Sequence, residues 1–178
     1  HDKTGKLKIL NVICRVYLTV IRGTPTMIQL LIMNFVIFGS VSVNKIIVGG
    51  LAFGINSGAY VAEIVRSGIM SIDQGQFEAG RSLGLNYTQT MTKIILPQAV
   101  KNILPALGNE LIVLLKETSI SGYIGLMDLT RGGDIIRSQT YSALFPLLAV
   151  AAIYLVIVCF LTYLVGRLER RLRTNERK

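Results

Sequence analysis

The segment from Ser142 to Gly166 contains no charged residue and is followed at once by Arg167, Glu169 and Arg170. As an α-helix rising 1.5 Å per residue, it would be about 37 Å long, more than the roughly 30 Å of a bilayer's hydrocarbon core. This segment is therefore expected to cross a membrane, and an ordinary soluble domain is excluded.

The basic residues of the chain are clustered. The sequence has 19 Lys and Arg against 10 Asp and Glu, a net charge of +9, and 51% of its residues are hydrophobic. In a soluble protein this charge would indicate a nucleic-acid partner. Here the basic residues gather in the first 22 positions, between Arg66 and Lys101, and from Arg167 to Lys178. Basic segments that flank apolar ones are typical of cytoplasmic loops in membrane proteins, so no nucleic acid is expected.

Three further segments resemble membrane spans. The predicted spans lie at about residues 23–44, 46–69, 98–119 and 142–166. The expected fold class is an all-α membrane protein, a multi-span helical bundle with four spans visible, in which residues 1–178 form one transmembrane domain. Positive-inside reasoning places both chain ends and the loop at about 71–96 in the cytoplasm.

The sequence has no residues for conventional catalysis. His1 is the only histidine, and Cys14 and Cys159 lie far apart in apolar surroundings. A Ser-His-Asp triad, a histidine-based metal site and a disulfide framework are therefore not expected. No segment matches GxxxxGK followed by Ser or Thr, so a usual nucleotide-binding loop is not expected either. We predict no catalytic residue, metal or cofactor bound by this chain.

The second predicted span combines small and charged residues. Its small residues recur every four positions and so share one helical face, which favours close packing of another helix; they are Gly50, Gly54, Gly58 and Ala62. Glu63 and Arg66 follow at a spacing of three, which predicts an ion pair on one face.

The third predicted span contains two features that disturb a membrane helix. Pro105 removes a backbone donor and Gly108 loosens the same turn, which predicts a kink or an unwound segment. Glu110 lies near the expected midplane, where a carboxylate needs a partner. It could contact the ammonium group of an amino acid, or make a structural ion pair with Lys101 or Lys116.

The loop between the second and third predicted spans carries the most specific pattern. It reads Glu78-Ala79-Gly80, then Leu83 and Gly84, and ends in Ile94-Ile95-Leu96-Pro97. These spacings resemble the cytoplasmic EAA loop of ABC importer permeases, with Gly80 where the family often has alanine. The resemblance implies a coupling helix that docks on an ATPase. Ser71 and Gln74 have capping-box spacing, and Gly84 is suited to a left-handed cap.

Three further segments are similar to those of polar amino-acid permeases, the histidine, glutamine, glutamate, arginine and opine group. They are Ile21-Arg22-Gly23-Thr24-Pro25, Gly58-Ala59-Tyr60 with Glu63 to Ile69, and Gly108-Asn109-Glu110 with Leu115 to Ser119. The group usually has five spans, and we expect the first to be missing from this sequence.

The resemblance implies a type I importer of the bacterial inner membrane, in which this chain is the translocation subunit and no enzyme. Its expected partners are a cytoplasmic ATPase dimer that uses ATP and Mg²⁺, a second permease copy or paralogue, an extracytoplasmic solute-binding protein, an amino-acid substrate and the lipid bilayer. From depth and family likeness, Gly58, Tyr60, Asn109 and Glu110 are expected to form the substrate site.

Two other interpretations stay open at this point. A channel or secondary transporter that needs no nucleotide would explain the spans but not the loop. A structural or assembly subunit would leave the intramembrane charges Glu63, Arg66 and Glu110 unexplained.

Overall fold

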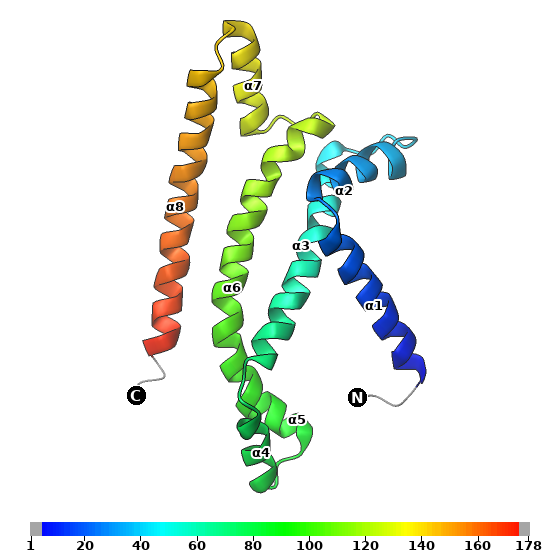
Figure 1. Cartoon of the computed structure of the whole chain (residues 1–178), viewed down its shortest axis with the longest axis vertical. Coiled ribbons are helices and arrows are strands. Elements are labelled where there is room, and N and C mark those ends of the chain that lie inside the picture. Colours follow the sequence, from blue (N-terminus) through cyan, green and yellow to red (C-terminus); the bar gives the residue numbers. More distant parts are fainter. Residues whose placement is uncertain (1–4, 175–178) are drawn as a thin grey trace. The chain divides into compact units, whose positions relative to one another are not determined.

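The structure, a computed structural model, describes residues 5–174, and within that range the chain is helical and contains no strand (Figure 1). The outermost residues of the two predicted basic ends, 1–4 and 175–178, lie outside the described residues. The chain separates into two compact units. The first falls within His1–Tyr60 and Leu114–Ile153, and the second within Val61–Val113 and Tyr154–Lys178.

The first unit contains the amino-terminal helices and the segment before the last helix. Its elements are α1 (Gly5–Gly23), α2 (Thr26–Ile32), the π-helix η1 (Met33–Ile37), the first part of α3 (Lys45–Met70), the 3₁₀-helix η3 (Thr118–Ile124), α7 (Leu129–Thr140) and the first part of α8 (Leu144–Thr174). Its core brings together Leu30 of α2, Ala52 and Phe53 of α3, and Ile124 of η3, all buried. Burial of these apolar side chains joins segments that are far apart in the sequence.

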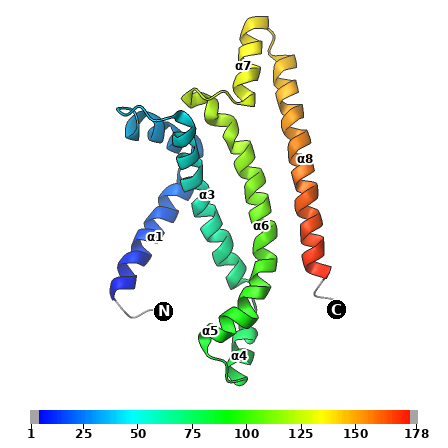
Figure 2. The same ribbon diagram turned by 180° about the vertical axis from the view of Figure 1, so that it is seen from behind.

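The second unit contains the remainder of α3 and α8 together with α4 (Gln74–Ser82), α5 (Tyr87–Thr90), the π-helix η2 (Met91–Ile95) and most of α6 (Leu96–Glu117). Glycines allow its long helices to pack closely. A Cβ added at Gly68 would overlap the side chain of Ile103, and one added at Gly108 would lie 2.7 Å from Cγ2 of Val165. Figures 1 and 2 both show α4 and α5 beyond the ends of α3 and α6.

The predicted first span, a continuous helix over 23–44, is wrong. Helix α1 ends at Gly23, α2 begins at Thr26, and residues 38–44 are not helical. The axes of segments Lys8–Gly23 and Thr26–Ile37 differ by 107°. Pro25 explains the break, because it has no N–H for a continuing helix and disfavours helical geometry at the residue before it.

Pro105 was predicted to cause a kink or an unwound segment, and the unwound segment is wrong, because α6 is an uninterrupted helix from Leu96 to Glu117 with Pro105 inside it. Pro97 is the second residue of α6, but it follows other helical residues, because the π-helix η2 (Met91–Ile95) runs directly into α6.

Two helices within the described residues are long and apolar enough to cross a membrane, namely α3 and the Leu144–Leu172 part of α8. They correspond to the spans predicted at 46–69 and 142–166. Segments Lys8–Gly23 and Thr26–Ile37 are long and apolar enough only when they are taken together as one bent span. With this pair, the number of candidate spans rises to three. Helix α6 is not among them, because Lys101, Glu110 and Lys116 lower its hydropathy. The prediction of four spans is thus not reproduced by length and composition.

Candidate functional site

Helices α4 and α5 and the π-helix η2 form a small folded unit, which we call the coupling unit (residues 73–95). Helix α4 begins after Asp73, whose Oδ1 accepts a hydrogen bond from the backbone N–H of Gly75 at 2.8 Å. The prediction that Ser71 caps this helix is wrong. Its hydroxyl instead donates to the carbonyl of Gly68 and accepts a hydrogen bond from Asn102, which lies on α6. Asp73 is the better cap because its carboxylate also suits the positive end of the helix dipole.

The end of α4 is closed by a Schellman motif around Gly84. The N–H of Gly84 donates to the carbonyl of Arg81 at 2.9 Å, and the N–H of Leu85 donates to the carbonyl of Gly80 at 3.0 Å. Gly84 has a φ of 74°, which only glycine adopts without strain. The predicted left-handed cap is confirmed.

Helix α5 has its own capping box, which sequence reasoning missed. The backbone N–H of Gln89 donates to Oδ1 of Asn86 at 2.8 Å, and the N–H of Asn86 donates to Oε1 of Gln89 at 2.9 Å. The Asn-x-x-Gln spacing was the available signal. With three capped helix ends, the coupling unit has a defined shape although its two α-helices are short.

Gly80 provides the contact that holds α4 against α5. It is buried, and a Cβ added there would lie 2.6 Å from Cγ2 and 2.7 Å from Oγ1 of Thr90. Thr90 is only 2% exposed. Gly80 therefore has no room for the alanine that related loops often carry.

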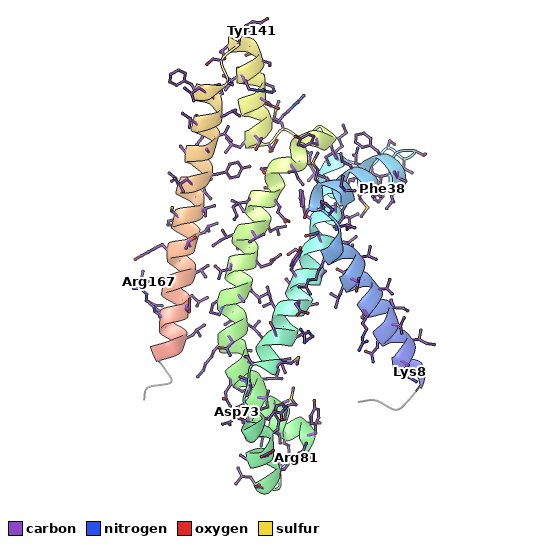
Figure 3. All side chains as sticks on the ribbon, in the orientation of Figure 1. Lys8, Phe38, Asp73, Arg81, Tyr141 and Arg167 are labelled. Carbon is purple, nitrogen blue, oxygen red and sulfur yellow. The ribbon has the colours of Figure 1, made fainter. Side chains whose placement is uncertain are left out.

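The other predicted coupling residues lie on the surface. Glu78, Ala79, Leu83 and Gly84 are all exposed, and the side chain of Leu83 is 74% exposed. Figure 3 labels Asp73 and Arg81, which mark the two ends of α4. The unit thus presents a carboxylate, a small residue and a leucine at its surface.

Replacement of Gly84 by alanine is expected to destabilise the coupling unit by about 1 kcal/mol, because an added Cβ meets no atom within 4 Å and only the left-handed backbone opposes it. The Gly84→Asn variant should lose less stability, because asparagine tolerates the left-handed conformation. Gly75→Ala serves as the control, since its Cβ would make only ordinary contacts. The measurement is the thermal inactivation of binding-protein-stimulated ATPase activity. Equal losses in the alanine and asparagine variants would contradict this explanation.

The break between α1 and α2 is closed by the side chain of Gln29. Its Nε2 lies 2.7 Å from the carbonyl oxygen of Ile21, 3.0 Å from that of Thr24 and 2.7 Å from the Thr24 hydroxyl. Nδ2 of Asn56, on α3, donates to Oε1 of Gln29 at 2.9 Å. These bonds satisfy carbonyls at the end of α1 without water, as a broken helix within a membrane requires.

One face of α1 is polar along its whole length. Its residues follow each other at intervals of three or four, and they are Lys8, Asn11, Arg15, Thr19 and Arg22. The opposite face carries exposed Ile9, Ile13, Val16 and Val20. The basic residues of this segment predicted a cytoplasmic end of the chain, although the helical spacing of its polar residues is visible in the sequence. A helix with this pattern is not stable when hydrocarbon surrounds it on all sides.

The first two predicted substrate residues lie on α3. An added Cβ at Gly58 would lie 3.2 Å from the hydroxyl oxygen of Tyr17, which itself donates to the carbonyl of Ile55 at 2.6 Å. The guanidinium carbon of Arg22 lies 5.8 Å from the ring centroid of Tyr60, a cation–π contact. The absence of a side chain at Gly58 thus leaves room for Tyr17 of α1, and the ring of Tyr60 contacts Arg22 of α1.

The other two predicted substrate residues lie on α6, in the second unit. Asn109 is exposed and Glu110 is half-buried. The predicted ion pair on α3 is present, with Nε of Arg66 donating to Oε2 of Glu63 at 2.9 Å. Within residues 5–174, no three His, Cys, Asp or Glu side chains are grouped to hold a metal ion.

The small residues of α3 that were predicted to pack against another helix do so only in part within the described chain. Gly58 meets Tyr17, but Cβ atoms added at Gly50 and Gly54 would meet no atom within 4 Å among residues 5–174. The buried face of α3 is a different one, with Val48, Ala52 and Asn56.

The family model described as "Binding-protein-dependent transport system inner membrane component" matches residues 4–174. The chain belongs to this family. The permease is 40% identical to the putative glutamine transport system permease protein GlnP of Rickettsia conorii over 176 residues, which are 97% of this chain and 80% of that protein. It is 42% identical to the arginine transport system permease protein ArtQ of Bacillus subtilis over 162 residues, which are 90% and 74% of the two chains.

Solved structures agree with this assignment. The permease superposes on a chain of the crystal structure of an amino acid ABC transporter with histidines with a TM-score of 0.87 and 47% identity, covering 92% of this chain and 77% of that one. A chain of the MetNI methionine ABC transporter, 22% identical with a TM-score of 0.76, covering 94% of this chain and 77% of that one, shares the fold. The predicted fold class, an all-α permease of the type I ABC importer kind, is confirmed.

The predicted role of this chain is confirmed as well. It is a permease subunit of an ABC importer, and ATP is hydrolysed by a separate subunit. Importers of this type combine such permeases with ATPase subunits and a substrate-binding protein. The alternative of a nucleotide-independent channel is therefore not favoured.

Proposed function

We propose that this permease imports a polar amino acid, of the glutamine or arginine class, across the bacterial inner membrane with its C-terminus in the cytoplasm. The observation that carries the proposal is the coupling unit, in which capped α4 presents Glu78, Ala79 and Leu83 at the surface. The substrate class is supported by relatives named as glutamine and arginine permeases at 40% and 42% identity.

The partners follow from the same arrangement. The coupling unit would dock on one subunit of a cytoplasmic ATPase dimer that uses ATP and Mg²⁺. A second permease, identical or related, would complete the pathway, and a solute-binding protein would deliver the amino acid from outside.

Movement of the coupling unit would reach α6 through Gln98, whose Nε2 donates to Oε1 of Gln76 on α4 at 3.4 Å. The adjoining ends of α3 and α6 also contact each other. Nδ2 of Asn102 donates to Oγ of Ser71 at 3.0 Å, and Gly68 packs against Ile103. Because closely packed helices move as rigid bodies, a shift of α4 would displace the ends of α3 and α6 together. Alternating access of the substrate site to the two sides would follow.

For the substrate site we propose Gly58, Tyr60, Asn109 and Glu110. A carboxylate on a membrane helix is suited to the ammonium group of an amino acid. The contact between Arg22 and Tyr60 supports this proposal, since it places a cation beside a predicted site residue, where it could attract the substrate's carboxylate.

Replacement of Glu110 by glutamine is expected to raise the KM of amino-acid uptake about tenfold, because a charge-assisted contact to the ammonium group becomes a neutral one. The test is ATP-driven uptake of labelled glutamine and of labelled arginine into vesicles that contain the full transporter. Glu169→Gln, which removes one negative charge from α8 outside the proposed site, controls for altered charge.

Each outcome of this test has a separate meaning. An unchanged KM in Glu110→Gln would remove this residue from the proposed site but leave the transporter assignment intact. Uptake that persists without ATP or without the ATPase would contradict the proposed function itself.

A further inference from the structure

The last helix ends in a surface that combines apolar and basic side chains. Only 6% of the most apolar 18-residue stretch within Leu144–Leu172 is buried inside the chain, and most of α8 is exposed. An exposed surface of this hydropathy in a membrane protein contacts lipid or another subunit. The helix becomes basic at Arg167, just after its charge-free segment.

Four residues at this end line a shallow open groove of about 240 Å³, and they are Leu164, Arg167, Leu168 and Arg171. Their spacing places them on one face of α8. Leu164 is 43% and Leu168 41% exposed. Neither Arg167 nor Arg171 makes an ion pair within residues 5–174, and Figure 3 shows Arg167 extending away from the ribbon of α8. The groove therefore joins an apolar surface to two available guanidinium groups.

A neighbouring face of α8 is already occupied. Val165 packs against Gly108 of α6, so that face cannot turn outwards without loss of this contact. The packing of Val165 holds the groove in one orientation relative to α6. A ligand that binds in the groove would meet a surface that is arranged before binding.

We propose that this groove binds the headgroup of an anionic phospholipid such as phosphatidylglycerol. Guanidinium groups form paired, charge-assisted hydrogen bonds with phosphate oxygens. The two leucines would contact the glycerol backbone and the start of an acyl chain, a contact that free phosphate does not need. The position fits as well, because basic residues directly after a span lie at headgroup level.

The inference rests on the membrane placement of α8 and not on the transported substrate. It is tested on the purified full transporter in neutral detergent, by native mass spectrometry during titration with phosphatidylglycerol and, separately, phosphatidylcholine. We expect one saturable phosphatidylglycerol site per permease, at least about tenfold tighter than phosphatidylcholine.

The decisive variant carries Arg167→Gln and Arg171→Gln together, which should weaken phosphatidylglycerol binding about tenfold or more. The matched control carries Arg131→Gln and Arg137→Gln, the same loss of charge on α7, and should bind as the wild type does. ATP-driven uptake in phosphatidylcholine vesicles should stay within about twofold of wild type in both variants, which shows that they fold. This readout also separates failure of the lipid site from failure of the proposed transport function.

Several outcomes would overturn the proposal. Equal loss of binding in the control would show general charge attraction. Displacement of the lipid by millimolar inorganic phosphate would identify a free-phosphate site instead. Cross-linking from a Leu168→Cys variant to the ATPase or to the second permease would show that a protein covers the groove.

Discussion

Replacement of Leu83 by lysine is expected to abolish ATP-driven uptake while the permease still enters the membrane. Leu83 follows the last residue of α4 and its side chain is 74% exposed, so its loss removes no core contact. A positive charge at a helix C-terminus is favourable, so α4 itself should not be weakened. In a desolvated docking contact, a buried lysine should cost about 2 kcal/mol or more of binding free energy, roughly a 30-fold loss of assembly.

The measurement is recovery of the ATPase with the purified permease, together with binding-protein-stimulated ATP hydrolysis in vesicles. Leu83→Met serves as the matched control, because it keeps an apolar side chain of similar volume and should retain most of the activity. Wild-type uptake by the lysine variant would remove Leu83 from the docking surface.

Replacement of Gly80 by valine is expected to uncouple ATP hydrolysis from uptake by forcing α4 away from α5. Even a Cβ at this position would lie 2.6 Å from Cγ2 of Thr90, and the two added methyl groups of valine enlarge the overlap. Overpacking of this kind costs about 1–3 kcal/mol. The contact lies within the coupling unit. Since about 1.4 kcal/mol corresponds to a factor of ten, we expect a tenfold or larger loss of uptake.

A second substitution tests whether this overlap is the cause. Thr90→Ala removes both atoms that lie nearest, and within residues 5–174 the hydroxyl of Thr90 has no hydrogen-bond partner to lose. In a double variant with Gly80→Ala, the Thr90→Ala substitution should restore uptake towards the level of Thr90→Ala alone. Failure of this rescue would mean that Gly80 is required for a contact with the ATPase and not with α5.

Two local patterns were predicted correctly because their deciding contacts lie within a few residues. Gly84 ends α4 as expected, because the Schellman bonds join residues no more than five apart. The ion pair of Glu63 and Arg66 formed for the same reason, at one helical turn. The prediction from the Ser71–Gln74 spacing was wrong, because Asp73 caps α4 and the Ser71 hydroxyl is engaged by Asn102 of α6.

Two prolines show where local rules end. Pro105 stays inside a continuous α6, whereas Pro25 lies at a bend of 107°. At the bend, Gln29 satisfies the carbonyls of Ile21 and Thr24, and Asn56 of α3 holds Gln29. A proline shows where a helix can break, but distant side chains decide whether the break is stable.

By itself, the sequence determined the class of the protein, the apolar helices α3 and α8, and the coupling loop with its left-handed cap, since hydropathy and capping depend on neighbours in the chain. Only the tertiary structure decided that α1 and α2 meet at a sharp break, that Gly80 must lack a side chain because of Thr90, and that Arg167 and Arg171 share a groove with two leucines. These features rest on contacts between elements and on the free space around them. Such contacts arise only when the helices pack.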